Sequence, residues 1–164
     1  MRAAATTILS GGLAVEIAEG GPGDAGPVAE FMLGLSLDSR HDRFFSIPST
    51  EALHAEVRSE LTTPGNLSLI ARTPEGRIVG HGLAAPHAGG GAELAFAIAD
   101  DVQHHGLGTT LLNGLVSAMR ARGVRRFEAT MLSENLPMRA VFAGAGFTLV
   151  AGSGSIEAVL ELAD

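Results

Sequence analysis

The sequence predicts one domain of the α/β (α+β) class, in which helices flank a mixed sheet. A chain of 164 residues normally builds a single core. Its residues are 46% hydrophobic, which is ample for that core, yet no apolar run reaches the ~18 residues of a membrane-spanning helix. Helical periods mix with pairs of strands along the chain, which argues against a purely parallel sheet. We therefore expect residues 1–164 to form one domain.

The chain up to residue 66 is predicted to contribute one strand and two helices. The run LAVEIA predicts the strand. Asp24 can cap the first helix, with Pro27 in its first turn, and Ser49 or Thr50 can cap the second. The polar sequence SLDSRHDRFFS between the helices favours an irregular segment. In order, we expect a frayed start (1–12), a strand (13–18), a helix (24–35), the irregular segment (36–46) and a helix (50–61).

The middle of the chain is predicted to form three strands and a glycine-rich loop. The turn PEGR joins the first two strands as a hairpin. In the third strand, ELAFAIA, alternation places Leu94, Phe96 and Ile98 on one face, with Glu93 and three alanines on the other. The expected strands are 67–73, 78–86 and 93–99, and the loop QHHGLG follows at 103–108.

The last third is predicted to alternate helices and strands. Apolar residues recur at helical spacing from Leu111 to Met119, and Gly123 suits the C-terminal end of that helix. Gly146 suits the end of the next one. We expect a helix (109–122), a strand (126–132), a helix (134–145) and two final strands (147–151 and 156–162).

The composition excludes several kinds of chemistry. The chain has no cysteine, hence no disulfide, thiolate metal site or cysteine nucleophile, and this suits a cytoplasmic protein. It has no tyrosine to act as a general acid and no lysine. The net charge of −7 argues against a general nucleic-acid binder. The six histidines lack the spacing of metal ligands, so we expect no metal site.

The loop QHHGLG stands between a strand and a helix, an arrangement that binds phosphate. Glycines let the backbone approach the phosphate, and a helix N-terminus offers free N–H groups. A Walker A loop is absent, and Leu111 stands where the dinucleotide fingerprint needs glycine. His104 and His105 are adjacent, so their side chains diverge, and we expect their backbone N–H groups rather than their rings to bind.

These residues resemble the motifs of the GNAT superfamily of N-acetyltransferases. VQHHGLGT at 102–109 is similar to its Q/R-x-x-G-x-G/A signature. Glu93 precedes the loop, LSEN follows the next strand at 132–135, and FAGAGF at 142–147 resembles the Y-x-x-x-G-F ending. The match covers about residues 92–150. A narrower resemblance joins residues 36–45, with the pattern S-x-x-S-x-x-x-R-F-F, to GNAT domains of bacterial protein-lysine acetyltransferases.

The resemblance implies a fold and a co-substrate. The fold is a GNAT-like mixed, twisted and mostly antiparallel sheet with flanking helices, whose central strands splay to form a cleft. The co-substrate is acetyl-CoA, with its pantetheine along the end of the strand before the loop and its pyrophosphate on the N–H groups of the loop. The residues expected to contact acetyl-CoA are Phe96, Ala97, Ile98, Ala99, Gln103, His104, His105, Gly106, Leu107, Gly108, Thr109, Asn135, Met138 and Phe142.

The resemblance also implies catalytic and acceptor residues. Glu93 is expected to be the general base, because an amine with a pKa of about 10.4 must lose its proton before it attacks. Phe142 stands where many family members carry a tyrosine that protonates the departing thiolate, which phenylalanine cannot do. The acceptor pocket is expected against Arg43, Phe44 and Phe45.

The sequence therefore predicts an acetyl-CoA-dependent N-acetyltransferase that works by direct attack in a ternary complex, without a covalent enzyme intermediate. A protein lysine side chain is the favoured acceptor. A small amine, such as a polyamine, amino acid or aminoglycoside, and a non-catalytic acyl-CoA-binding module are the alternatives. We expect a cytoplasmic monomer or homodimer with no nucleic-acid or membrane partner.

Overall fold

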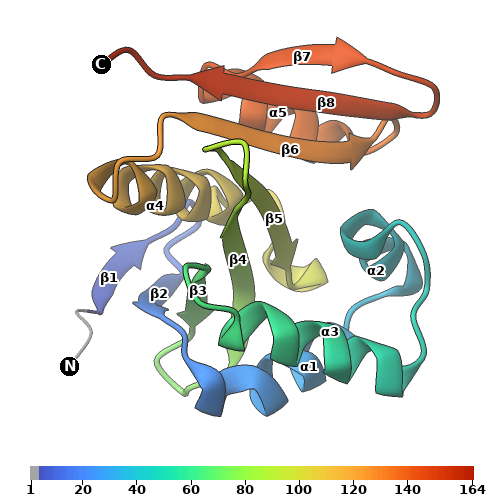
Figure 1. Ribbon diagram of the computed structural model, residues 1–164. Helices are drawn as coiled ribbons and strands as arrows, with labels where there is room; N and C mark the ends of the chain where they lie inside the picture. Colours follow the sequence, from blue (N-terminus) through green and yellow to red (C-terminus); the bar gives the residue numbers. More distant parts are fainter. Residues whose placement is uncertain (1–3) are drawn as a thin grey trace.

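A computed structural model describes residues 4–164 as an open eight-stranded sheet with helices on both faces (Figure 1). The strand order is β1-β2-β3-β4-β5-β6-β8-β7, and every neighbouring pair is antiparallel except β5 and β6. The expected fold class is thus confirmed. The strands are β1 (Ala5–Ile8), β2 (Ala14–Glu19), β3 (Leu67–Arg72), β4 (Ile78–Pro86), β5 (Ala92–Ile98), β6 (Arg126–Leu132), β7 (Thr148–Ala151) and β8 (Ser155–Glu161).

Within residues 4–164, five α-helices and two short 3-10 turns accompany the sheet. The helices are α1 (Ala25–Leu33), α2 (Leu37–Phe44), α3 (Thr50–Thr62), α4 (Leu107–Ala121) and α5 (Leu136–Gly144), and the turns are η1 (Pro22–Asp24) and η2 (Asp100–Val102). The predicted strands and helices outside the two segments corrected below lie within two residues of these bounds.

The sheet divides at its only parallel pair. Strands β5 and β6 are paired at two positions, Ala92 with Phe127 and Glu93 with Glu128, and then separate. On either side, β4 pairs with β5 over seven positions and β6 pairs with β8 over seven. Figure 1 shows β4 and β5 diverging from the β6–β8–β7 unit. The central strands therefore splay apart, as the family resemblance implies.

The two faces of the sheet carry separate cores. On one face, the apolar stripe of α4 packs with α5 against Leu94 and Phe96 of β5. On the other face, α1 and α3 pack against Ile70 of β3 and Ala97 of β5. Alternating residues of β5 therefore face different helices, so this strand forms a wall shared by both halves of the molecule.

Two sequence predictions about the first half of the chain are wrong. Residues 5–8 are not frayed but form β1, which pairs along β2 and gives the sheet one more strand. Residues 37–44 are not irregular but form α2. Ser36 caps this helix by accepting a hydrogen bond from the Ser39 amide at 3.1 Å. A serine cap with Asp38 in the first turn is a helix-start signal, but the low hydrophobicity of the segment obscured it.

The helices around the cleft begin at other residues than the sequence suggested. Helix α4 begins at Leu107, inside the glycine-rich loop, and Gly106 is its N-cap with φ of 88°. Helix α5 begins at Leu136, and its N-cap is Asn135. The Oδ1 atom of Asn135 accepts a hydrogen bond from the Met138 amide at 3.3 Å.

Candidate active site

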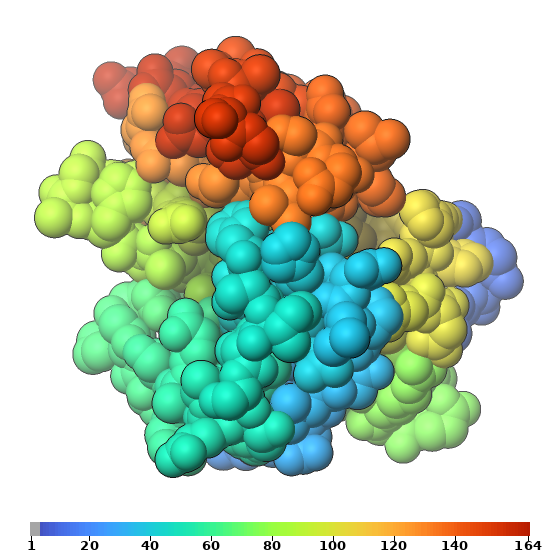
Figure 2. Space-filling view, turned by 90° about the vertical axis from the view of Figure 1, so that its right-hand side faces the viewer, coloured from blue at the N-terminus to red at the C-terminus, as the bar shows by residue number. Residues whose placement is uncertain are grey.

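A cavity of about 340 Å³ fills the opening between β5 and β6. Its walls come from β5, the loop before α4, the start of α5 and one side of α2. Figure 2 faces the side of the molecule where α2, the segment around residue 134 and the loop after β5 converge. The sequence-predicted residues that line the cavity are Arg43, Phe96, Ala97, Ile98, Gln103, His104, Gly106, Leu107, Gly108, Asn135, Met138 and Phe142.

The loop before α4 presents backbone N–H groups to this cavity. Its chain takes the left-handed conformation at His104, with φ of 67°, and again at Gly106. The first residues of a helix have no intrahelical acceptor for their N–H groups, and the helix N-terminus carries a partial positive charge. Gly108 contributes a bare backbone there: an added Cβ would lie 3.5 Å from Val141, so the fold itself leaves room for a ligand atom. This arrangement suits the pyrophosphate of a CoA molecule.

Two side chains of the loop are engaged elsewhere. The Nδ1 atom of His105 lies 2.8 Å from the carbonyl oxygen of Ser10, so this ring joins the loop to the β1–β2 turn and does not line the cavity. Gln103 donates from Nε2 to the Ile98 carbonyl and to Ser39 Oγ, each at 3.3 Å. Thr109 and Ala99 also lie outside the lining residues.

Phe142 is a core aromatic at the back of the cavity. Its side chain is 1% exposed and makes edge-to-face contacts with Phe96 and Phe147, with ring centroids 5.8 and 4.9 Å apart. The ring closes the space between α5 and β5. It has no titratable group, so a proton for the leaving thiolate has to come from another source.

Glu93 lies at the point where β5 and β6 part. It is exposed, pairs across the sheet with Glu128, and is not among the residues that line the cavity. Strand alternation puts it on the same face as Ala95 and Ala97, both of which do line the cavity. The carboxylate therefore stands beside the narrow end of the cavity rather than in its wall.

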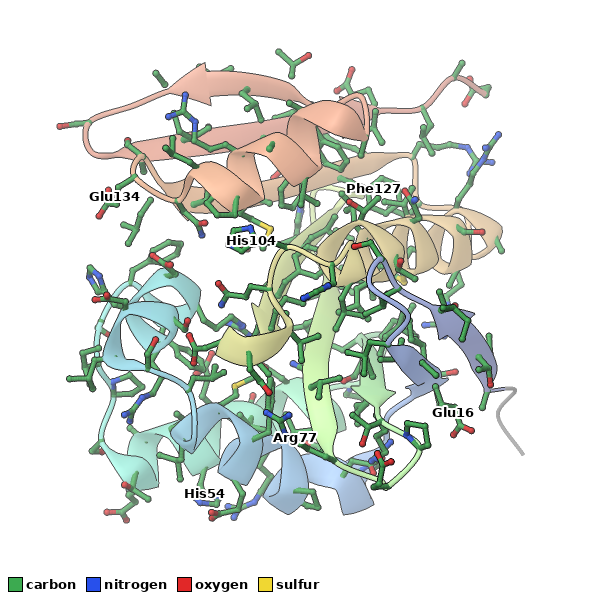
Figure 3. All side chains as sticks on the ribbon, turned by 180° about the vertical axis from the view of Figure 1, so that it is seen from behind. Glu16, His54, Arg77, His104, Phe127 and Glu134 are labelled. Atoms are coloured by element: carbon green, nitrogen blue, oxygen red, sulfur yellow. The ribbon has the colours of Figure 1, made fainter. Side chains whose placement is uncertain are left out.

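Two carboxylates that the sequence reasoning missed line the cavity instead. Asp42 comes from α2 and Glu134 from the segment between β6 and α5. Burial raises the pKa of Asp42; His41 opposes this rise, while Glu134 and Asp38 add to it. Glu134 is therefore close enough to Asp42 to affect its charge, and Figure 3 shows Glu134 across from α2. Recognising α2 as a helix would have pointed to Asp42.

Of the three residues expected to form the acceptor wall, only Arg43 lines the cavity. Its side chain is 7% exposed, and its Nη2 atom lies 2.5 Å from Oε1 of Glu60, which is 8% exposed. The guanidinium of Arg43 lies over the ring of Phe44, with its Cζ atom 4.7 Å from the ring centre. Phe45 ends α2 with φ of 59° and is exposed. Arg43 therefore belongs to a buried ion pair at the edge of the cavity.

The described residues contain neither a cluster of metal ligands nor a helix that could span a membrane. No group of three or more His, Asp or Glu side chains within residues 4–164 is arranged to hold a metal ion. No helix in the same range has the length and apolar character needed to cross a bilayer.

The splayed sheet and this cavity give the chain the fold of an acetyltransferase domain. More particularly, the family model described as "Acetyltransferase (GNAT) family" matches residues 35–147, and the chain belongs to that family.

Individual relatives agree with this assignment. Acetyltransferase Pat of Mycolicibacterium smegmatis is 40% identical over 50 residues, which are 30% of this chain and only 15% of that protein. The GNAT domain of S. lividans PAT has 26% identity and a TM-score of 0.82, with 97% of each chain covered. YncA, a putative acetyltransferase from Salmonella typhimurium solved with acetyl-CoA, has a TM-score of 0.69 at 20% identity, covering 92% of this chain and 95% of that one.

Proposed function

We propose that this chain transfers the acetyl group of acetyl-CoA to the side-chain amine of a protein lysine, by direct attack in a ternary complex. One observation carries the proposal: the cavity is lined both by the glycine-rich loop before α4 and by two neighbouring carboxylates, Asp42 and Glu134. The loop suits the anionic co-substrate, and the carboxylates suit a cationic acceptor. The resemblance of residues 36–45 to protein-lysine acetyltransferases supports the same acceptor.

The two carboxylates of the cavity are not neutralised by arginine side chains of residues 4–164. Within residues 4–164 neither Asp42 nor Glu134 forms an ion pair with an arginine, although other carboxylates of the chain do. Arg43, the nearest cation in the sequence, is held by Glu60. Two neighbouring carboxylates repel each other, and an ammonium group between them would relieve that repulsion. The acceptor would thus be drawn to the cavity in its charged form.

The reaction then requires the acceptor to lose two protons, one before the attack and one as the amide forms. The neutral amine nitrogen attacks the thioester carbonyl carbon, a C–N bond forms, the C–S bond breaks as CoA leaves as a thiolate, and the nitrogen releases its second proton to solvent, which leaves a neutral amide. We propose Glu93 as the base, acting through a water molecule, since it stands beside the narrow end of the cavity on the face of Ala95. Phe142 cannot supply the proton for the thiolate, which is taken from solvent.

A thiol-release assay with purified chain and acetyl-CoA tests the proposal. The acceptors are a lysine-containing peptide, the same peptide with its lysines acetylated, a polyamine, an amino acid and an aminoglycoside. We expect the unmodified peptide to give the highest kcat/KM. A preference for one of the small amines would overturn the protein-lysine acceptor. Binding of CoA by calorimetry without turnover of any acceptor would overturn the proposal as a whole.

Carboxylate variants test the recognition step separately. Asp42→Asn combined with Glu134→Gln should raise the KM for the peptide by about tenfold, because charge-assisted contacts to the ammonium are lost, and leave the Kd for CoA nearly unchanged. Asp38→Asn is the matched control, since Asp38 is an exposed carboxylate of the same helix that does not line the cavity. If the wild type, the double variant and Asp38→Asn have equal KM values for the peptide, Asp42 and Glu134 do not bind the acceptor.

A further inference from the structure

Helix α2 forms one wall of the cavity but has little of its own to hold it there. It has eight residues, and of its two hydrophobic side chains Leu37 is exposed, while only Phe44 packs, partly buried, against a core cluster. Helices this short are not stable in isolation, and most helices in proteins are fixed by a broader apolar face. Polar contacts therefore contribute much of what holds α2 in position. At its C-terminal end the contact is the Arg43–Glu60 pair; at its N-terminal end it is Asp100.

The carboxylate of Asp100 is hydrogen-bonded to the first turn of α2 by three contacts. It accepts hydrogen bonds from the Ser36 amide at 2.9 Å, from Ser36 Oγ at 2.9 Å and from Ser39 Oγ at 2.6 Å. Ser36 is also the cap of the helix. Asp100 thus holds both the capping residue and the next serine, which lie more than sixty residues away in the sequence.

Asp100 also lies between the two segments expected to hold acetyl-CoA. It opens η2, directly after β5 and just before the loop at 103–108. Gln103 completes the connection, because its Nε2 atom donates both to the Ile98 carbonyl at the end of β5 and to Ser39 of α2. The loop, the strand end and the helix therefore form one hydrogen-bonded unit on the edge of the cavity.

We propose that Asp100 is a positioning residue that couples occupation of the acetyl-CoA loop to the placement of α2, and through α2 to the side of the cavity carrying Asp42. The kinetic part of this inference rests on the proposed function; the structural part rests only on the chain binding CoA. A ligand that fixes residues 98–108 also fixes Asp100, and with it the start of the helix. The coupling is reciprocal, so an ordered α2 favours the bound form of the loop.

The charge of Asp100 does not change in an ordinary assay. Burial alone would raise the pKa of this carboxyl, but the hydrogen bonds from Ser39 and Ser36 outweigh it and hold the pKa below its usual range. A depressed pKa means that the contacts are fully present above the usual range and are lost only as the pH falls through the lowered value. Between pH 6 and 9 the effect of removing Asp100 should therefore not vary, unlike the effect of removing a general base.

The test compares Asp100→Ala with Asp101→Ala. Asp101 is the next residue and is also exposed and hydrogen-bonded, but its partner is Arg77, with N–O distances of 2.7 and 2.8 Å, and not α2. The first readout is amide hydrogen exchange of peptides covering residues 36–46, with and without CoA. We expect CoA to slow this exchange in the wild type and in the Asp101 variant, and to leave it unchanged in the Asp100 variant.

The second readout is kinetic. Asp100→Ala should lower kcat/KM for the acceptor about tenfold at every pH from 6 to 9, with less than about threefold change in the Kd for CoA. Asp100→Asn keeps one acceptor oxygen, so its kcat/KM should lie between those of the wild type and of Asp100→Ala. Ser39→Ala should reproduce part of the loss and add little to Asp100→Ala, because both changes remove the same bond.

The outcomes separate the inference from the proposed function. Two results overturn the coupling. One is that CoA slows exchange in residues 36–46 equally in the wild type and in Asp100→Ala; the other is that CoA does not change this exchange in the wild type. If the wild type acetylates no acceptor, the proposed function fails, and the exchange comparison still decides the role of Asp100. If Asp100→Ala does not fold, Asp100→Asn takes its place in the same exchange comparison.

Discussion

Glu93 and Asp42 are the two carboxylates best placed to take a proton, and they meet the cavity differently. Asp42 lines it and is partly desolvated, whereas Glu93 is exposed beside its narrow end. A residue in the wall can hold the acceptor directly, while a residue beside it acts through water. Their variants should therefore fail in different ways, in binding for Asp42 and in proton transfer for Glu93.

Glu93→Gln should lower kcat by about 10²- to 10³-fold near pH 7 and by much less above about pH 10.4, where the amine loses its proton unaided. The pH–rate profile of the acetyl transfer measures this. Glu128→Gln is the matched control, since Glu128 is opposite Glu93 in the sheet but is held by Arg126. If Asp42→Asn, and not Glu93→Gln, shows a loss of kcat that disappears at high pH, Asp42 is the base.

The loop before α4 should depend on its glycines more than on its histidines. Gly106→Val forces a β-branched residue into a left-handed conformation, and Gly108→Val puts bulk where the ligand is expected; each should abolish detectable CoA binding. His104→Ala should weaken it only a few-fold. His105→Ala removes the contact with Ser10 and should cost about 1 kcal/mol of stability. Calorimetric titration with CoA measures the Kd of each variant. If the histidine variants bind CoA normally but lose turnover, the prediction that the glycines matter more than the histidines is contradicted.

At the scale of elements, α2 depends on charge where the other helices depend on apolar contact. The Arg43–Glu60 pair is almost completely buried, and the Arg43 Nε and Glu60 Oε2 atoms have no hydrogen-bond partner within residues 4–164. Burial raises the pKa of Glu60, and the Arg43 charge opposes that rise. Such a pair contributes little net stability while intact, but losing one partner leaves a buried charge uncompensated.

Arg43→Met should therefore lower the free energy of unfolding by about 3 kcal/mol, and Arg43→Met with Glu60→Leu should recover much of the loss. Arg72→Met is the control: Arg72 pairs with Asp24 at 3.0 Å, but both side chains are about one-third exposed, so its loss should cost less than about 1 kcal/mol. Urea unfolding at pH 7 provides the comparison. Equal losses for the two single variants would mean that burial of the pair has no energetic consequence.

At the scale of the whole molecule, a buried histidine makes stability depend on pH. His81 of β4 is fully buried, its ring nitrogen Nε2 lies 2.6 Å from Ser68 Oγ, and its Nδ1 has no partner in the described chain. Burial, together with the Arg43 charge, lowers the pKa of His81 to about 3. Because the unfolded side chain titrates near 6.5, the unfolded state takes up a proton that the folded state refuses.

This contribution to stability is fully present above about pH 6.5 and is lost progressively as the pH falls toward 3. Between pH 7 and 5, His81 alone should lower the free energy of unfolding by about 2 kcal/mol. Urea unfolding at the two pH values should show the drop in the wild type and in His54→Gln, a surface control, and a smaller drop in His81→Gln. An NMR titration of His81 that shows protonation above pH 5 in the folded protein would contradict the prediction.

The sequence could predict the order of elements, because hydrophobic periodicity and capping residues are local signals. It could also predict the glycine-rich loop, since Gly106 and Gly108 are visible as residue types. It could not predict that α2 is a helix fixed by Asp100, because that contact spans 64 residues. Nor could it predict that His105 bonds to Ser10, or that Phe44 and Phe45 turn away from the cavity.

The sequence by itself determined the class of this protein: the motifs from Glu93 to Phe147 identify an acetyltransferase, and the absence of cysteine and tyrosine limits its chemistry. Only the tertiary structure decided which carboxylates line the cavity. Strand pairing between β5 and β6 stops at Glu93, which does not line the cavity, while the position of α2 places Asp42 in the lining near Glu134. Proximity between distant segments depends on where strands part and helices dock, and no local pattern of residues records it.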